Sequence, residues 1–512
     1  MIPYVRKSFY KHFIDGLKYI LNIGISKDKI ERSIEDEFYL KYPKVYEYAM
    51  DMTERELKQA VEGLYHNLNT LQSRSGNQLP FSSINYGTCT LPEGRMVIKA
   101  LLEGSIEGTG EYHRTSIFPC GIFQLMKGVN RKEGEPNYDL FKLALKSTSQ
   151  RLYPNYVNCD WSGNEGYDKN DPRTYMSTMG CRTANGLDIN GLGQLKDGRG
   201  NICPVTIIMP TLAMQAKEVA LKQYELSDKS VKFETIHFNC FMKLLEKKIS
   251  EAKDMLIERF EWICSQSPKA ASFMYENNTM AGYVKEEGIR SALKHGTLAI
   301  GNIGLAETLQ IIIKEDHTSE IGMELAKKIY TLFSKKCKEY KEKYKLNFGV
   351  YNTPAETLCH TALKKFKDKY GVIENVSDKK FFTNSMHVPV WKKLNPFEKI
   401  DIESQLTSYS SAGCITYVEL PSTTKNNLDA LETIVNYAMD KDIPYFAINI
   451  PVDRCASCSY TDEINDVCPM CGSKEIHRLR RVTGYITGDY LTAFNDGKID
   501  EVGHRVKHID KF

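Results

Sequence analysis

Hydrophobic residues recur at helical spacing in four stretches of the chain. In residues 5–21, Phe9, Phe13 and Leu17 fall on one face of a helix, and most of the basic residues fall elsewhere. The same spacing predicts three more helices: 44–71, 241–263 (Phe241, Leu245, Ile249, Ala252, Leu256, Phe260 and Ile263) and 321–332 (Ile321, Leu325, Ile329 and Leu332). Stripes of this kind are predicted to be core faces.

Short, continuous apolar runs between the helices have strand character. They predict strands at residues 115–118, 205–209, 297–303, 414–420 and 445–450. Parallel strands that are buried on both faces read as continuous apolar runs, so the alternation of helix and strand favours an α/β architecture. Glycine and asparagine cluster in residues 158–201, which predicts loops near a site or a mobile segment.

Composition narrows the class of protein. With 512 residues, 42% of them hydrophobic, the chain can form one large domain or two to four ordinary ones. The formal charge of +3 gives no general field for nucleic acid or an anionic membrane. Charged residues interrupt the apolar ones in residues 1–21, and no other stretch could span a bilayer, so we expect a cytoplasmic protein. Fourteen cysteines then favour metal binding or thiol chemistry over disulfides.

Four cysteines near the C-terminus form two tight pairs separated by nine residues. They are Cys455, Cys458, Cys468 and Cys471. This spacing is typical of a zinc ribbon, and four cysteine ligands leave no open position, so we predict a structural zinc. Gly472 would supply a left-handed turn residue. The alternatives are four unrelated cysteines and a nucleic-acid-binding ribbon, although the basic run 477–481 is short and lacks interleaved aromatics.

Residues 481–485, Arg-Val-Thr-Gly-Tyr, resemble the radical-bearing loop of glycyl-radical enzymes. From its sequence context alone, Gly484 would be an ordinary turn residue. Glycine nevertheless suits a backbone radical, because an α-carbon without a Cβ can flatten and share its unpaired electron with both flanking amides. We expect the zinc ribbon to position this loop inside the catalytic domain.

Further segments resemble class III, anaerobic ribonucleotide reductases over nearly the whole chain. They are residues 4–15, 80–87, 179–182, 295–307, 351–358, 383–388 and 415–419. The resemblance implies a ten-stranded α/β barrel, here lacking its first strands, with a cysteine-bearing finger loop at its centre. It also implies three regions: the barrel (1–450), the zinc-binding ribbon (451–475) and the glycyl-radical loop with the tail (476–512).

The resemblance assigns the central chemistry to two residues. Cys181 would be the thiol oxidised by the radical at Gly484, and its thiyl radical would abstract the 3′-hydrogen of a ribonucleoside triphosphate before the 2′-hydroxyl leaves as water. Sulfur suits this role because its S–H bond is close in strength to the α C–H bond of glycine and to an activated ribose C–H bond. Without the resemblance, Cys181 would be interpreted as a small buried hydrophobic residue.

Substrate-binding residues are also implied. Asn201 lies where the family has an asparagine beside the ribose hydroxyls, although asparagine is also common in turns. Residues 353–357 predict a helix start with Pro354 at an early helical position, where free amides, with Thr353, Ala355 and Glu356, could cradle phosphates. The glycines of residues 295–304 indicate close backbone approach or simply tight strand packing.

The chain departs from the family at its start. Family members usually begin with an ATP-binding cone and the first part of the barrel, which carries a second active-site cysteine. Cys89 and Cys120 lie in other motifs and do not match it. Because a barrel without its opening strands would expose strand edges, we expect one piece of a split reductase, completed by a separately encoded N-terminal polypeptide. A truncated pseudoenzyme is the alternative.

The resemblance further implies several partners: a radical S-adenosylmethionine activase, dNTP and ATP effectors, a homodimer, and formate as a possible reductant. Two other classes remain open. One is a glycyl-radical lyase related to pyruvate formate-lyase, which relies on adjacent cysteines that this sequence does not contain. The other is a non-catalytic zinc-ribbon binding protein, which a near-neutral charge and a large α/β body support poorly.

Overall fold

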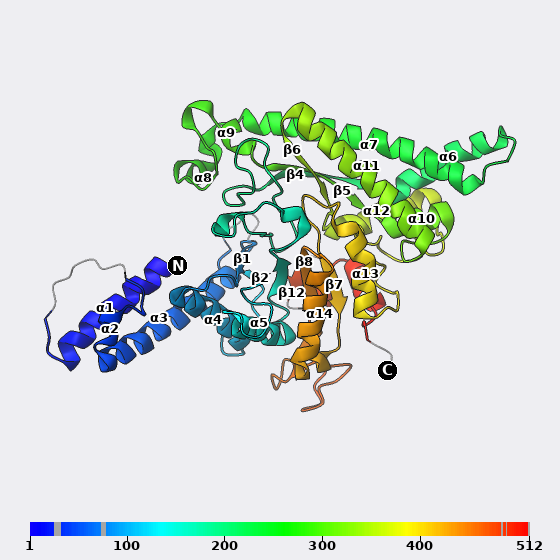
Figure 1. Ribbon diagram of the computed structural model, residues 1–512. Helices are drawn as coiled ribbons and strands as arrows, with labels where there is room; N and C mark the ends of the chain where they lie inside the picture. Colours follow the sequence, from blue (N-terminus) through cyan, green and yellow to red (C-terminus); the bar gives the residue numbers. More distant parts are fainter. Residues whose placement is uncertain (25–31, 73–77, 483–484, 488, 510–512) are drawn as a thin grey trace. The chain divides into compact units, whose positions relative to one another are not determined.

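The computed structural model describes residues 1–24, 32–72, 78–482, 485–487 and 489–509. Contacts divide the chain into two units: Met1–Tyr156 with Thr423–Glu432, and Val157–Ser422 with Thr433–Phe512 (Figure 1). Within these described ranges, every helix is too short or too polar to cross a membrane.

The first unit is built on helices and a parallel strand pair. Its elements are α1 (Ile2–Ile20), α2 (Glu37–Leu40), α3 (Pro43–Thr70), β1 (Ser83–Tyr86), α4 (Pro92–Glu107), β2 (Cys120–Leu125) and α5 (Tyr138–Arg151), with β3 (Asn155–Asn158) at its boundary. The predicted helices 5–21 and 44–71 are confirmed, and they pack together through Phe9 and Phe13. The predicted strand 115–118 is wrong: β2 begins at Cys120, after Pro119, which has no N–H to donate to a sheet.

The second unit alternates strands and helices. Its strands are β4 (Asn201–Ile208), β5 (Thr297–Ile303), β6 (Asn347–Tyr351), β7 (Thr416–Glu419) and β8 (Tyr445–Asn449). Its helices are α6 (Met209–Glu225), α7 (Phe233–Cys264), α8 (Ser272–Glu276), α9 (Arg290–Leu293), α10 (Leu305–Ile313), α11 (Glu320–Tyr344), α12 (Glu356–Tyr370), α13 (Pro396–Thr407), α14 (Leu428–Asp440), α15 (Tyr490–Ala493) and α16 (Asp496–His504). The residues of α14 up to Glu432 belong to the first unit. Strands β4, β5 and β6 pair in parallel, as do β7 and β8. The predicted α/β class is confirmed, and β5, β6 and β8 are buried along their whole length.

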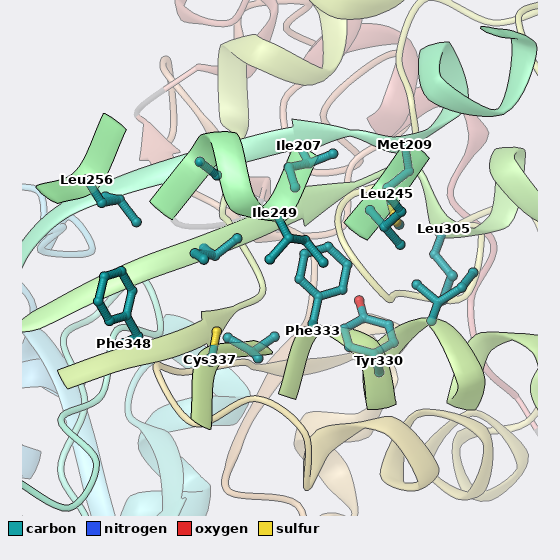
Figure 2. Packing of buried hydrophobic residues seen from close by; sticks show 14 of the residues in the cluster. Ile207, Met209, Leu245, Ile249, Leu256, Leu305, Tyr330, Phe333, Cys337 and Phe348 are labelled. Carbon is teal, nitrogen blue, oxygen red and sulfur yellow. The ribbon is translucent and has the colours of Figure 1, made fainter. Parts of the chain in front are cut away.

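Helices α7 and α11 cover the β4–β5–β6 sheet, and their buried faces meet in one cluster (Figure 2). The predicted stripe of α7 is confirmed from Phe241 to Phe260. The stripe predicted for α11 is partly wrong, because Ile321 is 60% exposed while Tyr330 and Phe333 are fully buried. The sequence of α11 offers two adjacent apolar faces, and packing against β6 and α7 selects between them.

The C-terminal part forms a small antiparallel sheet of order β10-β9-β11-β12. Its strands are β9 (Val452–Cys455), β10 (Thr461–Asp462), β11 (Ile476–Val482) and β12 (Tyr485–Thr487). Asp453, which is fully buried in β9, pairs with Arg480 of β11 across the sheet. This sheet carries the four clustered cysteines and leads directly to residues 483–484.

Candidate active site

Cys181 lies at the turn of a short hairpin within the loop-rich stretch that the sequence predicted. Thr178 and Ala184 form an antiparallel bridge at its base, and the Met179 N–H donates to the Thr183 carbonyl at 2.8 Å. The Cys181 Sγ is 3.6 Å from the Thr183 Oγ1, and the residue is partly buried. The hairpin therefore holds the thiol at a defined position that is not sealed from a ligand.

A pair of hydroxyl groups connects this hairpin to the sheet. The Thr183 Oγ1 lies 2.7 Å from the phenol oxygen of Tyr351, the last residue of β6. Burial raises the pKa of Tyr351 well above its usual range, so the phenol stays neutral. The thiol of Cys181 thus has neutral hydroxyls beside it.

Arg182 anchors the hairpin in the protein interior. It is fully buried, and Gly413 makes room for it, because a Cβ there would lie 2.1 Å from the Arg182 carbonyl oxygen. Its guanidinium donates to the Asn352 carbonyl (3.2 Å), the Asn384 Oδ1 (2.8 Å) and the Tyr417 hydroxyl (3.2 Å). No carboxylate in the described ranges pairs with it. A positive charge held by neutral groups therefore lies next to the candidate thiol.

A buried cluster of His387, Glu403 and Lys399 lies next to Arg182. The Nε2 of His387 is 3.5 Å from the guanidinium, and its Nδ1 is 3.3 Å from the Glu403 Oε2. Burial lowers the pKa of His387 to about 4, so the imidazole is neutral at physiological pH. Burial alone would raise the pKa of Glu403, but the Lys399 ammonium and His387 bring it well below its usual range. Lys399 forms an ion pair with Glu403 and balances its charge. The His387–Glu403–Lys399 cluster therefore adds no net negative charge to compensate Arg182.

Asn384 links the cysteine hairpin to the candidate phosphate-binding loop. Its Oδ1 accepts from Arg182, while its Nδ2 donates to the Pro354 carbonyl. The resemblance had pointed to the segments that contain Asn384 and Tyr417, but not to these side chains or to Thr183. No sequence signal marked them, because their roles depend on partners that lie far along the chain.

Thr353 is buried beside two strands of the sheet. Its Oγ1 lies 2.9 Å from the Thr206 Oγ1 of β4. A Cβ on Gly301 of β5 would lie 1.8 Å from the same oxygen. The sequence left close backbone approach and tight strand packing open at this glycine, and the neighbour that lies closest to it is the side chain of Thr353.

Helix α12 begins two residues after Pro354, later than the sequence suggests. Ala355 is its N-cap, in the left-handed region with φ 51°, and Glu356 is its first residue. Pro354 therefore precedes the helix and does not lie in its first turn, which corrects the prediction. The amides of a first helical turn have no partner within the helix and attract anions. The side chain of Glu356 is outside the part of the chain that the structure describes.

Asn201 is the first residue of β4 and does not lie in a turn. Its Oδ1 is buried without a hydrogen-bond partner in the part of the chain that the structure describes. The preceding Gly200 lies near the cysteine hairpin, because a Cβ there would be 3.8 Å from the Met179 Cε. A buried amide oxygen without a donor is costly, so this position suits a hydroxyl-bearing ligand.

Gly484 lies outside the described residues, but its flanking strands are defined. Val482 pairs with Tyr485 between β11 and β12. Burial raises the pKa of Tyr417, and the positive charges of Arg182 and Arg481 oppose that rise. Tyr417 therefore lies within electrostatic reach of two arginines, one adjacent to Cys181 and one three residues before Gly484.

The four clustered cysteines are arranged to hold a metal ion. Their sulfurs all lie within 4.8 Å of one another, and the Cys455–Cys471 and Cys458–Cys468 pairs are 3.5 Å apart. These separations exceed the roughly 2.05 Å of a disulfide. A tetrahedral zinc at about 2.3 Å from each sulfur would place the sulfurs about 3.8 Å apart, so the cluster fits such an ion. The turn at Gly472 is left-handed, with φ 72°, as predicted.

Glu307 of α10 holds the loop that carries Asn384. Its Oε1 accepts from the Thr383 N–H at 2.6 Å, while its Oε2 has no partner in the described ranges. Burial raises the pKa of Glu307 to about 7. The Glu307 carboxyl has a pKa of 4.5 in the unfolded chain and about 7 in the folded protein. Between these two pH values the folded protein holds a proton that the unfolded chain has released, so the stability of the fold falls as pH rises from 4.5 to about 7.

We expect Glu307→Gln to be more stable than the parent at pH 8, by about 2 kcal/mol, because glutamine carries no charge to bury. At pH 4 the difference should nearly vanish, since Glu307 is then mostly protonated in both the folded and the unfolded state. Urea unfolding at both pH values measures this, with the exposed Glu374→Gln as the control. A gain that is equal at both pH values would contradict the assignment.

Comparisons with known proteins point to one family. The family model described as anaerobic ribonucleoside-triphosphate reductase matches residues 1–508. An anaerobic ribonucleoside-triphosphate reductase of Haemophilus influenzae is 32% identical over 482 residues, which cover 91% of this chain and 64% of that protein. The chain thus spans less than two thirds of this relative's length.

Solved structures show the same fold. One anaerobic ribonucleotide reductase superposes with a TM-score of 0.64 at 15% identity, covering 98% of this chain and 76% of that one. The Thermotoga maritima anaerobic ribonucleotide reductase in complex with dATP and CTP superposes with a TM-score of 0.60 at 16% identity, covering 88% and 69%.

Proposed function

Because this chain belongs to the anaerobic ribonucleoside-triphosphate reductase family, we propose that it reduces ribonucleoside triphosphates to deoxyribonucleoside triphosphates, with Cys181 as the substrate-activating thiol. The observation that carries the proposal is the anchoring of the Cys181 hairpin. Arg182 connects it to the loop before α12 through Asn384, and to β7 through Tyr417. This function is favoured over a glycyl-radical lyase and over a non-catalytic zinc-ribbon protein.

The roles of the other residues follow from their surroundings. A glycyl radical at Gly484, installed by an external activase, would be the stored radical from which a thiyl radical forms at Cys181, and it would be regenerated in each turnover while the reductant supplies the electrons. Cys181 would exchange a hydrogen atom with the ribose 3′-carbon, and the unpartnered Asn201 amide oxygen would accept from a ribose hydroxyl. Amides at the start of α12, near Thr353, Ala355 and Glu356, would hold the phosphates.

The finer architecture is also a proposal. The parallel strands and the likeness to a solved anaerobic ribonucleotide reductase support a ten-stranded barrel of the glycyl-radical type. Residues 1–450 would form the barrel with the finger loop near 181. Residues 451–475 would form the zinc ribbon, and residues 476–512 the radical loop and the tail.

We expect one zinc ion per chain, and we expect Cys458→Ser with Cys471→Ser to lose it. The ion would stabilise the ends of β9 and β11, so its loss should speed hydrogen exchange in residues 452–482 while the β4–β5–β6 sheet stays protected. Native mass spectrometry and hydrogen exchange measure these effects, with Cys264→Ser as the control. Zinc retained by the double variant would refute the ligand set.

We also propose that this chain has the binding partners that are typical of the family. The Thermotoga maritima enzyme in complex with dATP and CTP supports nucleotide substrates and dNTP or ATP effectors here. A radical S-adenosylmethionine activase, a homodimer, formate as reductant and a cytoplasmic location complete the proposal.

The test is anaerobic co-expression with a radical S-adenosylmethionine activase, followed by EPR and by chromatography of nucleotide products. Deoxyribonucleotide formation together with a glycyl doublet would support the reductase. A doublet with turnover of a non-nucleotide substrate would favour the lyase. Since the matched relative is longer, the assay is repeated with its remaining segment supplied. If the folded, zinc-loaded chain gives no product in either arrangement, the proposed function is wrong.

A further inference from the structure

A groove between α7 and α11 carries an unusual concentration of positive charge. The two helices run side by side over the β4–β5–β6 sheet (Figure 1), and the groove, which is open to solvent, has a volume of about 450 Å³. Five lysines and one carboxylate line it: Lys243, Lys247, Lys253, Lys336, Lys343 and Glu246. None of these residues takes part in the site around Cys181.

Two of the lysines are neutralised within the protein. Lys336 pairs with Glu246 at 2.7 Å and with Glu339 at 3.1 Å. Lys253 pairs with Asp254 at 2.5 Å. The single carboxylate of the groove is therefore already engaged and cannot balance the other lysines.

The remaining three lysines form no ion pair with any residue in the described ranges. Lys243 and Lys247 stand four residues apart on the same face of α7, an arrangement of like charges that costs a helix a few tenths of a kcal/mol, about 0.2–0.5. Lys343 lies over the ring of Tyr344, with its ammonium 5.2 Å from the ring centroid. The five lysines and the three carboxylates that pair with them, Glu246, Glu339 and Asp254, leave a net charge of about +2, which a bound anion would offset.

The base of the groove is preformed. Lys253 is only 7% exposed, and its ammonium lies 5.6 Å from the ring centroid of Tyr340 and 5.2 Å from that of Tyr344. It also donates to the Tyr344 hydroxyl at 3.3 Å. This bond, with the nearby Lys343, lowers the pKa of the Tyr344 phenol. A lysine held between two aromatic rings gives the groove a rigid floor, and Asp254 balances its charge.

We propose that the α7–α11 groove binds the polyphosphate group of a small molecule, at a site separate from the one around Cys181. Lysine ammonium groups are compact point charges that suit phosphate oxygens. The volume falls within the roughly 300–1,000 Å³ that is usual for small-molecule sites. A triphosphate offers one phosphate group for each of the three unpaired lysines, whether it is free or belongs to a nucleotide. This inference does not depend on the proposed function.

Calorimetric titration of the full, zinc-loaded chain with inorganic tripolyphosphate tests the site. The dissociation constant should rise at least about 10-fold in Lys243→Gln with Lys247→Gln. It should not change in the charge-matched control, Lys269→Gln with Lys285→Gln. ATP is titrated in parallel: tighter binding of ATP identifies a nucleotide site, and tighter binding of tripolyphosphate a free polyphosphate site. No saturable binding, or equal weakening in the control, overturns the proposal.

Lysine acylation read by mass spectrometry locates the ligand without any mutation. Saturating tripolyphosphate should protect Lys243, Lys247 and Lys343, while Lys269 and Lys285 react as before. Equal protection of all lysines, or none at the groove, would overturn the proposal even if the variants fail to fold.

Discussion

Replacement of Cys181 by serine is expected to abolish nucleotide reduction, with a loss of about 10³-fold or more, while a glycyl-radical signal still forms. An O–H bond is far stronger than an S–H bond, so serine cannot pass a hydrogen atom between glycine and ribose. The loss corresponds to about 4 kcal/mol or more in the reaction barrier. Serine can keep the short contact with Thr183, so the hairpin should remain in place.

The measurement compares deoxyribonucleotide formation and the EPR signal of the activated parent and variant. Cys264→Ser is the matched control, because Cys264 is also a partly buried free thiol but lies at the end of α7. The control should retain full turnover. Substantial turnover by the Cys181 variant would remove this residue from the proposed chemistry.

Replacement of Gly484 by alanine is expected to eliminate both the radical signal and turnover. A Cβ would crowd the flattened α-carbon and add a barrier to hydrogen abstraction at that backbone position. Oxygen should cleave the activated parent chain at residue 484 and leave the variant intact. Anaerobic EPR, followed by mass spectrometry after exposure to air, measures all three effects.

Gly503→Ala provides the control, because a Cβ at this helical glycine of α16 would meet no atom within 4 Å. It should give the parent's signal, activity and cleavage. A doublet of normal intensity in the Gly484 variant would show that the radical is stored at another residue.

Local patterns determined much of what could be predicted from the sequence. The cysteine spacing predicted a four-sulfur cluster because both pairs lie on tight turns, whose geometry depends on a few neighbouring residues. Apolar runs predicted β5 and β8 closely, since a strand buried on both faces leaves a continuous hydrophobic record. The family resemblance, and not periodicity, singled out Cys181.

Contacts between residues far apart in the sequence determined the side-chain partners, the close packing and the burial at the site. Arg182 bonds groups that are 170, 202 and 235 residues away, and no pattern within a short window encodes such partners. From the sequence, Gly301 could serve close backbone approach or tight strand packing. Only the structure shows that the side chain of Thr353 occupies the space of its missing Cβ. The raised pKa of Glu307 likewise follows from burial, which depends on the surrounding fold.

The sequence by itself therefore determined the α/β class and the cysteine cluster, because each leaves a local signature of spacing or residue type, while the family resemblance pointed to the candidate thiol and glycine. Only the tertiary structure decided which face of α11 is buried, how Arg182 joins three segments beside Cys181, and where unpaired lysines meet between α7 and α11. The physical reason is that packing, desolvation and charge depend on neighbours in space, and folding chooses those neighbours from distant parts of the chain.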